Sequence, residues 1–306
     1  MKSVYIDCTD FGQSVLTPAI LSKVPGLAIH VGDPDPAKLT AMIEGAVGVL
    51  NGHTIMDETL LTRSTALRTI VFLGTGASTY IDLAAAERLG ISVRTVRGYG
   101  DRTIAEHAFA LMLAGARSIA KMDREIRRRE WIAPVGIELA GKRLGVIGTG
   151  GIGRELIRLA AAFGMEVVAW NRSGVPADLP CKQVSLDDLL ETAHVVSLHL
   201  ALNDQTNGLL SRGKLEKMRP DAILVNVARG ALIDEAALVD LLRQGRIAHA
   251  ALDVFEQEPL PRDHPLTTLD NVTLTSHAAF KSREAMVRLL STGFDLLREE
   301  LYALSR

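Results

Sequence analysis

The 306-residue sequence predicts an α/β protein made of two doubly wound parallel-sheet domains. Two features lead to this prediction. Short apolar runs alternate with segments of helical spacing in the first 97 residues, and the same alternation starts again at residue 144. Strands that alternate with helices form parallel sheets covered on both faces, and a chain of this length is long enough for two domains with cores of their own.

The first series alternates predicted strands with predicted helices. The strands are SVYID, LAIHV, AVGVL, RTIVFLG and ISVRTV, each bounded by Gly, Asp or Pro. Between them, AKLTAMIEGA and YIDLAAAERLG have helical spacing, and Gly90 at the end of the second segment is typical of a helix end.

A long helical segment follows, from about Thr103 to Trp131, apolar at first and highly charged at its end. We expect one helix here, which either bridges two lobes or packs on a second subunit, or is simply an amphipathic surface helix. The basic run of residues 127–129 is flanked by Glu125 and Glu130, so it is interpreted as a solvated helix end.

The second series predicts strands at LGVIG, MEVVAW, VVSLHL, AILVNV, HAALDVF and NVTLTSH. The tail, SREAMVRLLSTGFDLLREELYALSR, has the spacing of one amphipathic helix. We expect this tail to return and pack on the first domain.

Charge and cysteine content restrict the possible functions. Lys and Arg number 34 and Asp and Glu 36, a net charge of −2, so electrostatics favour neither nucleic-acid nor anionic-membrane binding. Cys8 and Cys181 show no metal-type spacing, which predicts no metal and fits a reducing compartment. The sequence has no signal-peptide pattern and no run near the roughly 18 apolar residues of a membrane span. We therefore expect a cytoplasmic protein.

The segment LGVIGTGGIG predicts a dinucleotide site, because Gly148-x-Gly150-x-x-Gly153 lies between an apolar strand and a helix. Gly148 permits the tight turn, Gly150 lets the backbone approach a pyrophosphate, and Gly153 lets the helix lie close to the strand. Gly151 and Ile152 complete the predicted turn. In the following helix, one face is predicted to consist of Ile152, Leu156, Leu159 and Phe163.

The end of the second strand predicts which dinucleotide is preferred. An acidic residue here binds the ribose 2′-hydroxyl in NAD-specific sites, but this chain has Asn171, Arg172 and Ser173. An arginine beside a small polar residue suits a 2′-phosphate, so the sequence predicts a preference for NADP(H) over NAD(H). The alternative is that Arg172 is a solvated loop residue, or that it stacks on adenine without discriminating.

Four functional side chains follow apolar strands, at the sheet edge where α/β proteins bind ligands: Arg229, Asp253, Glu258 and His277. Each has an ordinary structural interpretation: a surface ion pair, a helix cap, a turn residue and a polar core group, respectively. Together, beyond a dinucleotide fingerprint, they suit reduction of a 2-oxo acid. A guanidinium holds the carboxylate and polarises the carbonyl, an imidazole protonates the nascent alkoxide, and a carboxylate orients the imidazole.

With these residues the sequence resembles the D-isomer-specific 2-hydroxyacid dehydrogenase family. The resemblance extends from about Leu67 to the tail and rests on the order and spacing of TGASTYID, TIAEHAFALMLAGAR, ELAGKRLGVIGTGGIG, VNVARGALIDEAALVDLL, ALDVFEQEPL and DHPLTTLDNVTLTSH. It implies two Rossmann-like domains with an interdomain cleft, usually as a homodimer. The substrate-binding, flavodoxin-like domain would be 1–97 plus 276–306, and the dinucleotide-binding domain 98–275.

The resemblance also implies residue roles. Arg229 would anchor the substrate carboxylate and carbonyl, His277 would be the general acid/base and Glu258 its partner. Gly76 and Ala77 match the loop whose backbone N–H groups hold the substrate carboxylate. The implied cofactor contacts outside the glycine turn and residues 171–173 are Thr103, Val227, Ala228 and Asp253, the last at the nicotinamide.

Several positions depart from the family pattern. Ala201 replaces a usual proline, Ser276 precedes His277 in place of proline, residues 278–281 lack the usual glycine, and the segment around Tyr99 is unusual. The leading interpretation is an NADP(H)-preferring reductase of glyoxylate, hydroxypyruvate or a similar small 2-oxo acid. The alternatives are a short-form phosphoglycerate dehydrogenase and a non-catalytic, dinucleotide-sensing corepressor-like protein. Oxidation of phosphite ranks low, because the LGTGA loop has no lysine.

Overall fold

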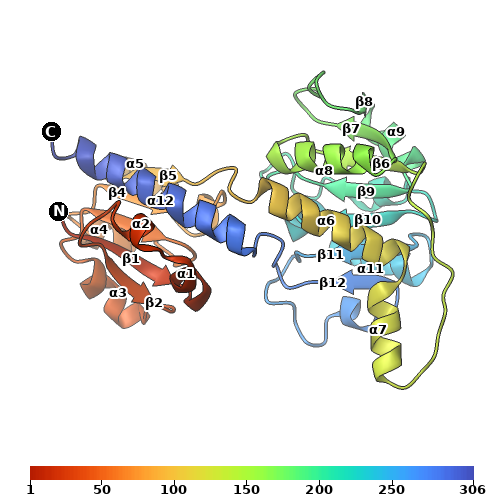
Figure 1. Ribbon diagram of the computed structural model, residues 1–306, viewed down its shortest axis with the longest axis horizontal. Helices are drawn as coiled ribbons and strands as arrows, with labels where there is room; N and C mark the ends of the chain where they lie inside the picture. Colours follow the sequence, from red (N-terminus) through yellow and green to blue (C-terminus); the bar gives the residue numbers. More distant parts are fainter. The chain divides into compact units, whose positions relative to one another are not determined.

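The computed structural model describes all residues 1–306 and divides into two compact units (Figure 1). Unit 1 comprises Met1–Gly100 with Lys281–Arg306, and unit 2 comprises Asp101–Phe280. The sequence prediction divides the chain after residues 97 and 275 and so assigns His277 to the first domain, whereas His277 lies in unit 2. The reason is local, because hydrogen bonds to Asp253 hold residues 277–279 in that unit.

Unit 1 is a parallel sheet with strand order β2-β1-β3-β4-β5. Its strands are β1 (Ser3–Cys8), β2 (Ala28–Val31), β3 (Gly48–Asn51), β4 (Thr69–Phe72) and β5 (Ser92–Thr95). Its helices are α1 (Asp10–Val15), α2 (Pro18–Leu21), α3 (Pro36–Ile43), α4 (Glu58–Arg63), α5 (Leu83–Arg88), the 3-10 turn Ala77–Thr79 and the tail helix α12 (Arg283–Ala303). All five predicted strands are confirmed, and the strand order is that of flavodoxin-like sheets.

The tail helix α12 packs on unit 1, as the sequence predicts. Phe294 and Leu297 are fully buried against strands β3 and β4. Gly293 permits the close approach, because a Cβ there would lie 2.4 Å from the Leu73 side chain. Lys23, just after α2, donates to Asp295 at 2.5 Å and so ties α12 to the start of the chain.

Unit 2 is a parallel sheet with strand order β12-β11-β10-β9-β6-β7-β8. The strands are β6 (Arg143–Ile147), β7 (Glu166–Trp170), β8 (Lys182–Gln183), β9 (Val195–Leu198), β10 (Ile223–Asn226), β11 (His249–Leu252) and β12 (Val272–Leu274). The helices are α6 (Asp101–Ala116), α7 (Ile119–Arg127), α8 (Gly151–Ala162), α9 (Leu186–Thr192), α10 (Arg212–Leu215) and α11 (Glu235–Arg243), with 3-10 turns at Gly230–Leu232 and Pro265–Thr268.

The strand order of unit 2 reverses direction at β6, which pairs with β7 on one side and β9 on the other. Successive residues of β6 point to opposite faces of the sheet. Val146 packs in the core on the α6 and α8 face, and Ile147 packs in the core on the α9 and α11 face. Ligands of such sheets bind at the carboxyl ends of the strands beside this reversal. No helix of either unit has both the length and the apolar character needed to cross a bilayer.

Of two helix predictions in unit 2, one is wrong and one is confirmed. The segment from 103 to 131 is two helices, because Ser118 has a left-handed backbone (φ 51°) that interrupts the helix between α6 and α7. The predicted face of α8 is confirmed: Leu156 is buried, Ile152 and Leu159 pack against the same core, and Phe163, 45% exposed, contacts the ring of Phe109. Helix α6 packs along α8 and covers this face.

Candidate active site

The glycine turn after β6 has the shape that a dinucleotide needs. Gly148 has a φ of +100°, and a Cβ there would lie 2.5 Å from the carbonyl oxygen of His199. A Cβ on Gly153 would lie 2.0 Å from the carbonyl oxygen of Gly148, so only glycine lets α8 start this close to the strand. Space in front of Gly150 is open, with nothing within 4 Å of its Cβ position. The turn is therefore closely packed at Gly148 and Gly153 and accessible to a ligand at Gly150.

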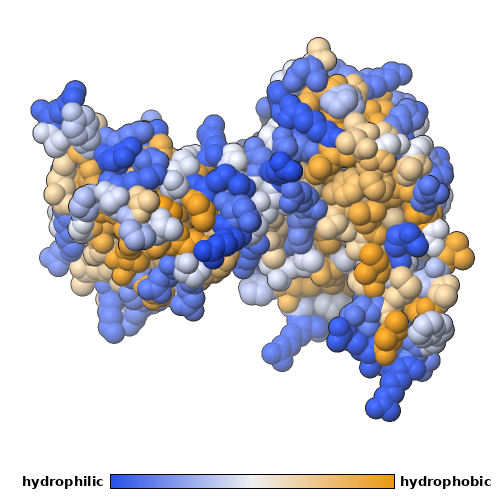
Figure 2. Space-filling model, in the orientation of Figure 1, coloured by the Kyte–Doolittle hydropathy of each residue, from blue (hydrophilic) through white to orange (hydrophobic).

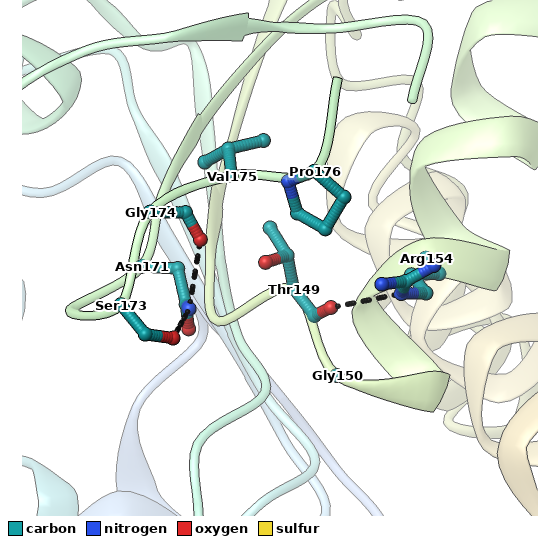
Figure 3. A pocket seen from close by; sticks show the side chains of 8 residues that line it. All are labelled: Thr149, Gly150, Arg154, Asn171, Ser173, Gly174, Val175 and Pro176. Atoms are coloured by element: carbon teal, nitrogen blue, oxygen red, sulfur yellow. Dashed lines mark hydrogen bonds between the residues drawn. The ribbon is translucent and has the colours of Figure 1, made fainter. Parts of the chain in front are cut away.

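The N-terminus of α8 is suited to an anion. Its N-cap is Gly150, which offers no side-chain acceptor to the free N–H groups of the first turn. Those N–H groups and the helix dipole favour negative charge at this position. Beside them is a pocket of about 430 Å³, lined by Thr149, Gly150, Arg154, Asn171 and residues 173–176 (Figure 3). These residues fit a bound dinucleotide.

Asp101 at the start of α6 lies directly against the first residue of α8. A Cβ on Gly151 would fall 1.8 Å from Asp101 Oδ2, so glycine at 151 leaves the space that the carboxylate occupies. Burial, together with the charge of Glu155, raises the pKa of Asp101. The sequence analysis did not identify Asp101, because the contact joins residues fifty positions apart along the chain. The predicted cofactor contacts of Thr103, half-buried in the same first turn of α6, and of Ile152 stay predictions.

The loop after β7 places two of its three predicted residues at the pocket. Asn171 Nδ2 donates to Ser173 Oγ at 2.8 Å and to the carbonyl oxygen of Gly174 at 3.0 Å, and both side chains line the pocket. Arg172 is exposed and is not among the lining residues. The guanidinium that does line the pocket belongs to Arg154, which the sequence analysis missed.

The end of β10 holds Arg229 in an extended conformation. The Asn226 side chain accepts from the amide of Ala228 at 3.0 Å and donates to the carbonyl oxygen of Arg229 at 2.8 Å. Arg229 Nη1 donates to the carbonyl oxygen of Ala228 at 2.6 Å. Val227 is buried and Ala228 half-buried, and their predicted cofactor contacts stay predictions.

Gly230 brings the Arg229 loop against the loop after β11. A Cβ at Gly230 would lie 1.9 Å from the carbonyl carbon of Phe255, so no other residue permits this approach. Phe255 in turn donates its amide to Glu258 Oε1 at 3.0 Å. The backbone thus joins the predicted substrate-binding arginine to the predicted acid/base pair.

Glu258 and His277 form a close pair. Glu258 Oε2 lies 2.6 Å from His277 Nδ1. Burial by itself would raise the pKa of Glu258, but the hydrogen bonds with His277 and the Phe255 amide, helped by the charge of Arg229, outweigh it and lower the pKa. The carboxylate therefore stays ionised and orients the imidazole, whose side chain is 39% exposed and can reach a ligand.

Asp253 fixes the backbone that carries His277. Its carbonyl oxygen accepts from the His277 amide at 2.8 Å, and its carboxylate accepts from the amides of Ala278 and Ala279, each at 2.9 Å. These bonds hold His277 at a φ of +48°, an uncommon conformation for a residue other than glycine. The carboxylate is fully buried, so the structure shows a positioning role, and its contact with the nicotinamide stays a prediction.

The carboxylate of Asp253 also contacts two side chains that the sequence analysis did not identify. Thr275 Oγ1 donates to Asp253 Oδ1 at 2.6 Å, and His107 Nε2 of α6 lies 3.1 Å from Thr275 Oγ1 and 3.6 Å from the same carboxylate oxygen. Burial would raise the pKa of Asp253, but these contacts and the two amides lower it. Helix α6 is thereby tied to the His277 loop.

Gly76 and Ala77 lie in unit 1, at the start of the 3-10 turn after β4. Their amides donate to no other group of the chain, whereas the carbonyl oxygens of the same turn accept from Thr79, Tyr80 and Ile81. Two unpaired N–H groups in a tight turn are suited to an anionic group. Their contact with a substrate carboxylate stays a prediction.

Comparison with known proteins identifies the family. A family profile described as D-isomer specific 2-hydroxyacid dehydrogenase, NAD binding domain, matches residues 109–279. A glyoxylate reductase of Aeropyrum pernix is 40% identical over 246 residues, covering 76% of this chain and 73% of that protein. The chain belongs to the D-isomer specific 2-hydroxyacid dehydrogenases, a family of oxidoreductases with a nicotinamide cofactor.

Two further relatives differ in what their names describe. A D-3-phosphoglycerate dehydrogenase of Archaeoglobus fulgidus is 39% identical over 246 residues, and the match covers 79% of this chain but only 46% of that protein. A solved acyclic imino acid reductase in complex with NADPH and D-Arg superposes with a TM-score of 0.87 at 29% identity, covering 100% of this chain and 97% of that one. The family is therefore shown, and the substrate differs among its members.

Proposed function

We propose that this chain reduces glyoxylate, hydroxypyruvate or a similar short 2-oxo acid, with NADPH preferred over NADH. The observation that carries the proposal is the 2.6 Å pair of Glu258 and His277, joined through Phe255 and Gly230 to Arg229. All of these residues follow strands of the sheet that also carries the glycine turn. A cation, a proton donor and a dinucleotide cradle on one sheet edge are the set that 2-oxo acid reduction needs.

The residues of the chain divide the chemistry among them. The glycine turn of residues 148–153 would hold the nicotinamide cofactor, which when bound would supply the hydride for the carbonyl carbon. Arg229 binds the substrate carboxylate through two N–H groups and stabilises negative charge on the carbonyl oxygen. Glu258 accepts a hydrogen bond from Nδ1–H of His277, so Nε2 is the atom that donates a proton to the forming alkoxide. Asp253 holds the backbone that carries the imidazole.

Absence of a carboxylate at residues 171–173 supports the preference for NADPH, because NAD-specific sites place an acidic group there. The acyclic imino acid reductase, which was solved in complex with NADPH, is consistent with this preference. The same enzyme preparation should show a kcat/KM at least about tenfold higher with NADPH than with NADH. Equal or better values with NADH would exclude the preference but not the reaction.

The reaction itself is tested with a substrate panel. Glyoxylate, hydroxypyruvate and 3-phosphohydroxypyruvate are each incubated with enzyme and both reduced cofactors, and cofactor oxidation is followed by absorbance. We expect the two short acids to be turned over fastest. Fastest turnover of the phosphorylated acid would favour the phosphoglycerate dehydrogenase alternative, and nucleotide binding without any turnover would favour a dinucleotide sensor.

We also propose that the chain forms a homodimer through α7 and the segment 128–138. Helix α7 buries none of its side chains, and Trp131 and Val135 are 89% and 99% exposed. Figure 2 shows hydrophobic residues over this region among hydrophilic ones. Large exposed apolar side chains on an extended segment are typical of a subunit contact.

Sedimentation of the wild type should give twice the 33.0 kDa chain mass, and the Trp131→Glu variant should sediment as a monomer. A wild-type monomer would contradict the proposal of a homodimer.

The cytoplasmic location stays a prediction.

A further inference from the structure

The pocket beside the glycine turn contains one charged side chain, that of Arg154. Arg154 lies in the first turn of α8, immediately after the last glycine of the fingerprint. Its Nε donates to the carbonyl oxygen of Thr149 at 3.3 Å, which turns the side chain back along the helix start toward the pocket (Figure 3). The guanidinium therefore belongs to the pocket wall formed by the turn.

The opposite wall is formed by the loop after β7. Ser173 Oγ accepts a hydrogen bond from Asn171, which leaves its own hydroxyl proton available to a ligand. No aspartate or glutamate lines the pocket, so its lining combines one positive charge with small polar groups and the apolar Val175 and Pro176. A pocket of this composition favours an anion that accepts several hydrogen bonds.

Besides its hydrogen bond to Thr149, the Arg154 guanidinium has one ion-pair contact within the chain, and that contact is weak. Arg154 Nη1 lies 3.8 Å from Asp178 Oδ2, and the two side chains are 39% and 61% exposed. An exposed pair at this distance contributes little. The guanidinium has no further hydrogen bond within the chain besides the one to Thr149, so two of its nitrogens can turn to a ligand without losing a strong partner.

We propose that Arg154, and not Arg172, is the residue that selects a 2′-phosphorylated dinucleotide. This inference rests on the proposed function, because it requires a dinucleotide at the turn of residues 148–153. With the pyrophosphate at the N-terminus of α8, the adenosine ribose lies between that turn and the end of β7, which is where the pocket is. The 2′-phosphate then receives the Arg154 guanidinium from one wall and the Ser173 hydroxyl from the other.

The test compares Arg154→Gln with Arg172→Gln, a matched pair of arginines of which one lines the pocket and the other is exposed beside it. Dissociation constants of NADPH and NADH are measured by calorimetry, without substrate. We expect Arg154→Gln to weaken NADPH binding by roughly ten- to a hundredfold and NADH binding by less than about twofold. Arg172→Gln should change both by less than about twofold. Arg154→Lys, which keeps the charge but loses the planar fork, should be intermediate.

Two results would overturn the inference. Equal weakening of NADPH and NADH in Arg154→Gln would show that Arg154 acts on the shared part of the dinucleotide or on the fold. Loss of selectivity in Arg172→Gln alone would assign the role to the loop arginine. A wild-type protein that binds neither nucleotide would overturn the proposed function itself, so the two failures are distinguishable.

Discussion

Replacing Arg229 with Gln is expected to lower kcat/KM for 2-oxo acids by roughly 10²- to 10³-fold, with dinucleotide affinity nearly unchanged. The Asn226 side chain holds the Arg229 backbone at the end of β10, and the guanidinium donates to the carbonyl oxygen of Ala228, so its function is set by position as well as by charge. Glutamine keeps a hydrogen-bond donor but removes the positive charge that would stabilise the developing alkoxide. Initial rates over a range of substrate concentrations give kcat and KM separately.

Arg229→Lys is the matched variant for that experiment. It keeps the positive charge but cannot donate two parallel hydrogen bonds to a carboxylate, so we expect a rise in KM and a partial loss of kcat. Calorimetric binding of NADPH serves as the folding control for both variants. Unimpaired turnover in Arg229→Gln would remove this residue from the reaction.

The Glu258→Gln variant should lower kcat by roughly 10²-fold or more, because the imidazole loses the acceptor that fixes its Nδ1 proton. In the wild type the carboxylate oxygen lies 2.6 Å from Nδ1, and the second oxygen accepts from the Phe255 amide. Glutamine can retain the amide contact but not the charge. If kcat were unchanged, Glu258 would be a structural residue of the turn and not the partner of His277.

A stability measurement separates the charge of Glu258 from its shape. Its pKa is lowered in the folded protein, so the ionised carboxylate stabilises the fold at pH values above the ordinary glutamate range, and this contribution is lost as the pH falls through the lowered pKa. Wild type should therefore have the higher Tm at pH 7, and the difference from Glu258→Gln should shrink below about pH 4. A difference independent of pH would contradict an electrostatic role.

Patterns that are local in the chain predicted most of the fold. Strand and helix periodicity located the strands of both sheets, and the glycine spacing after β6 predicted the turn whose close contacts the structure shows at Gly148 and Gly153. Strand ends also predicted Arg229, Glu258 and His277, because the carboxyl ends of parallel strands meet at one edge. Each of these inferences needs only neighbours within a few residues.

Contacts between distant segments decided the rest. The amino-acid sequence by itself determined the two parallel-sheet units, the dinucleotide turn and the residues that suit 2-oxo acid reduction. Only the tertiary structure showed that the Asp101 carboxylate lies against Gly151, that Asp253 is buried beneath the His277 loop, and that Arg154 faces the pocket in place of Arg172. The physical reason is that periodicity specifies which residues turn inward, whereas the partner of a buried or pocket-lining group depends on how non-neighbouring elements pack.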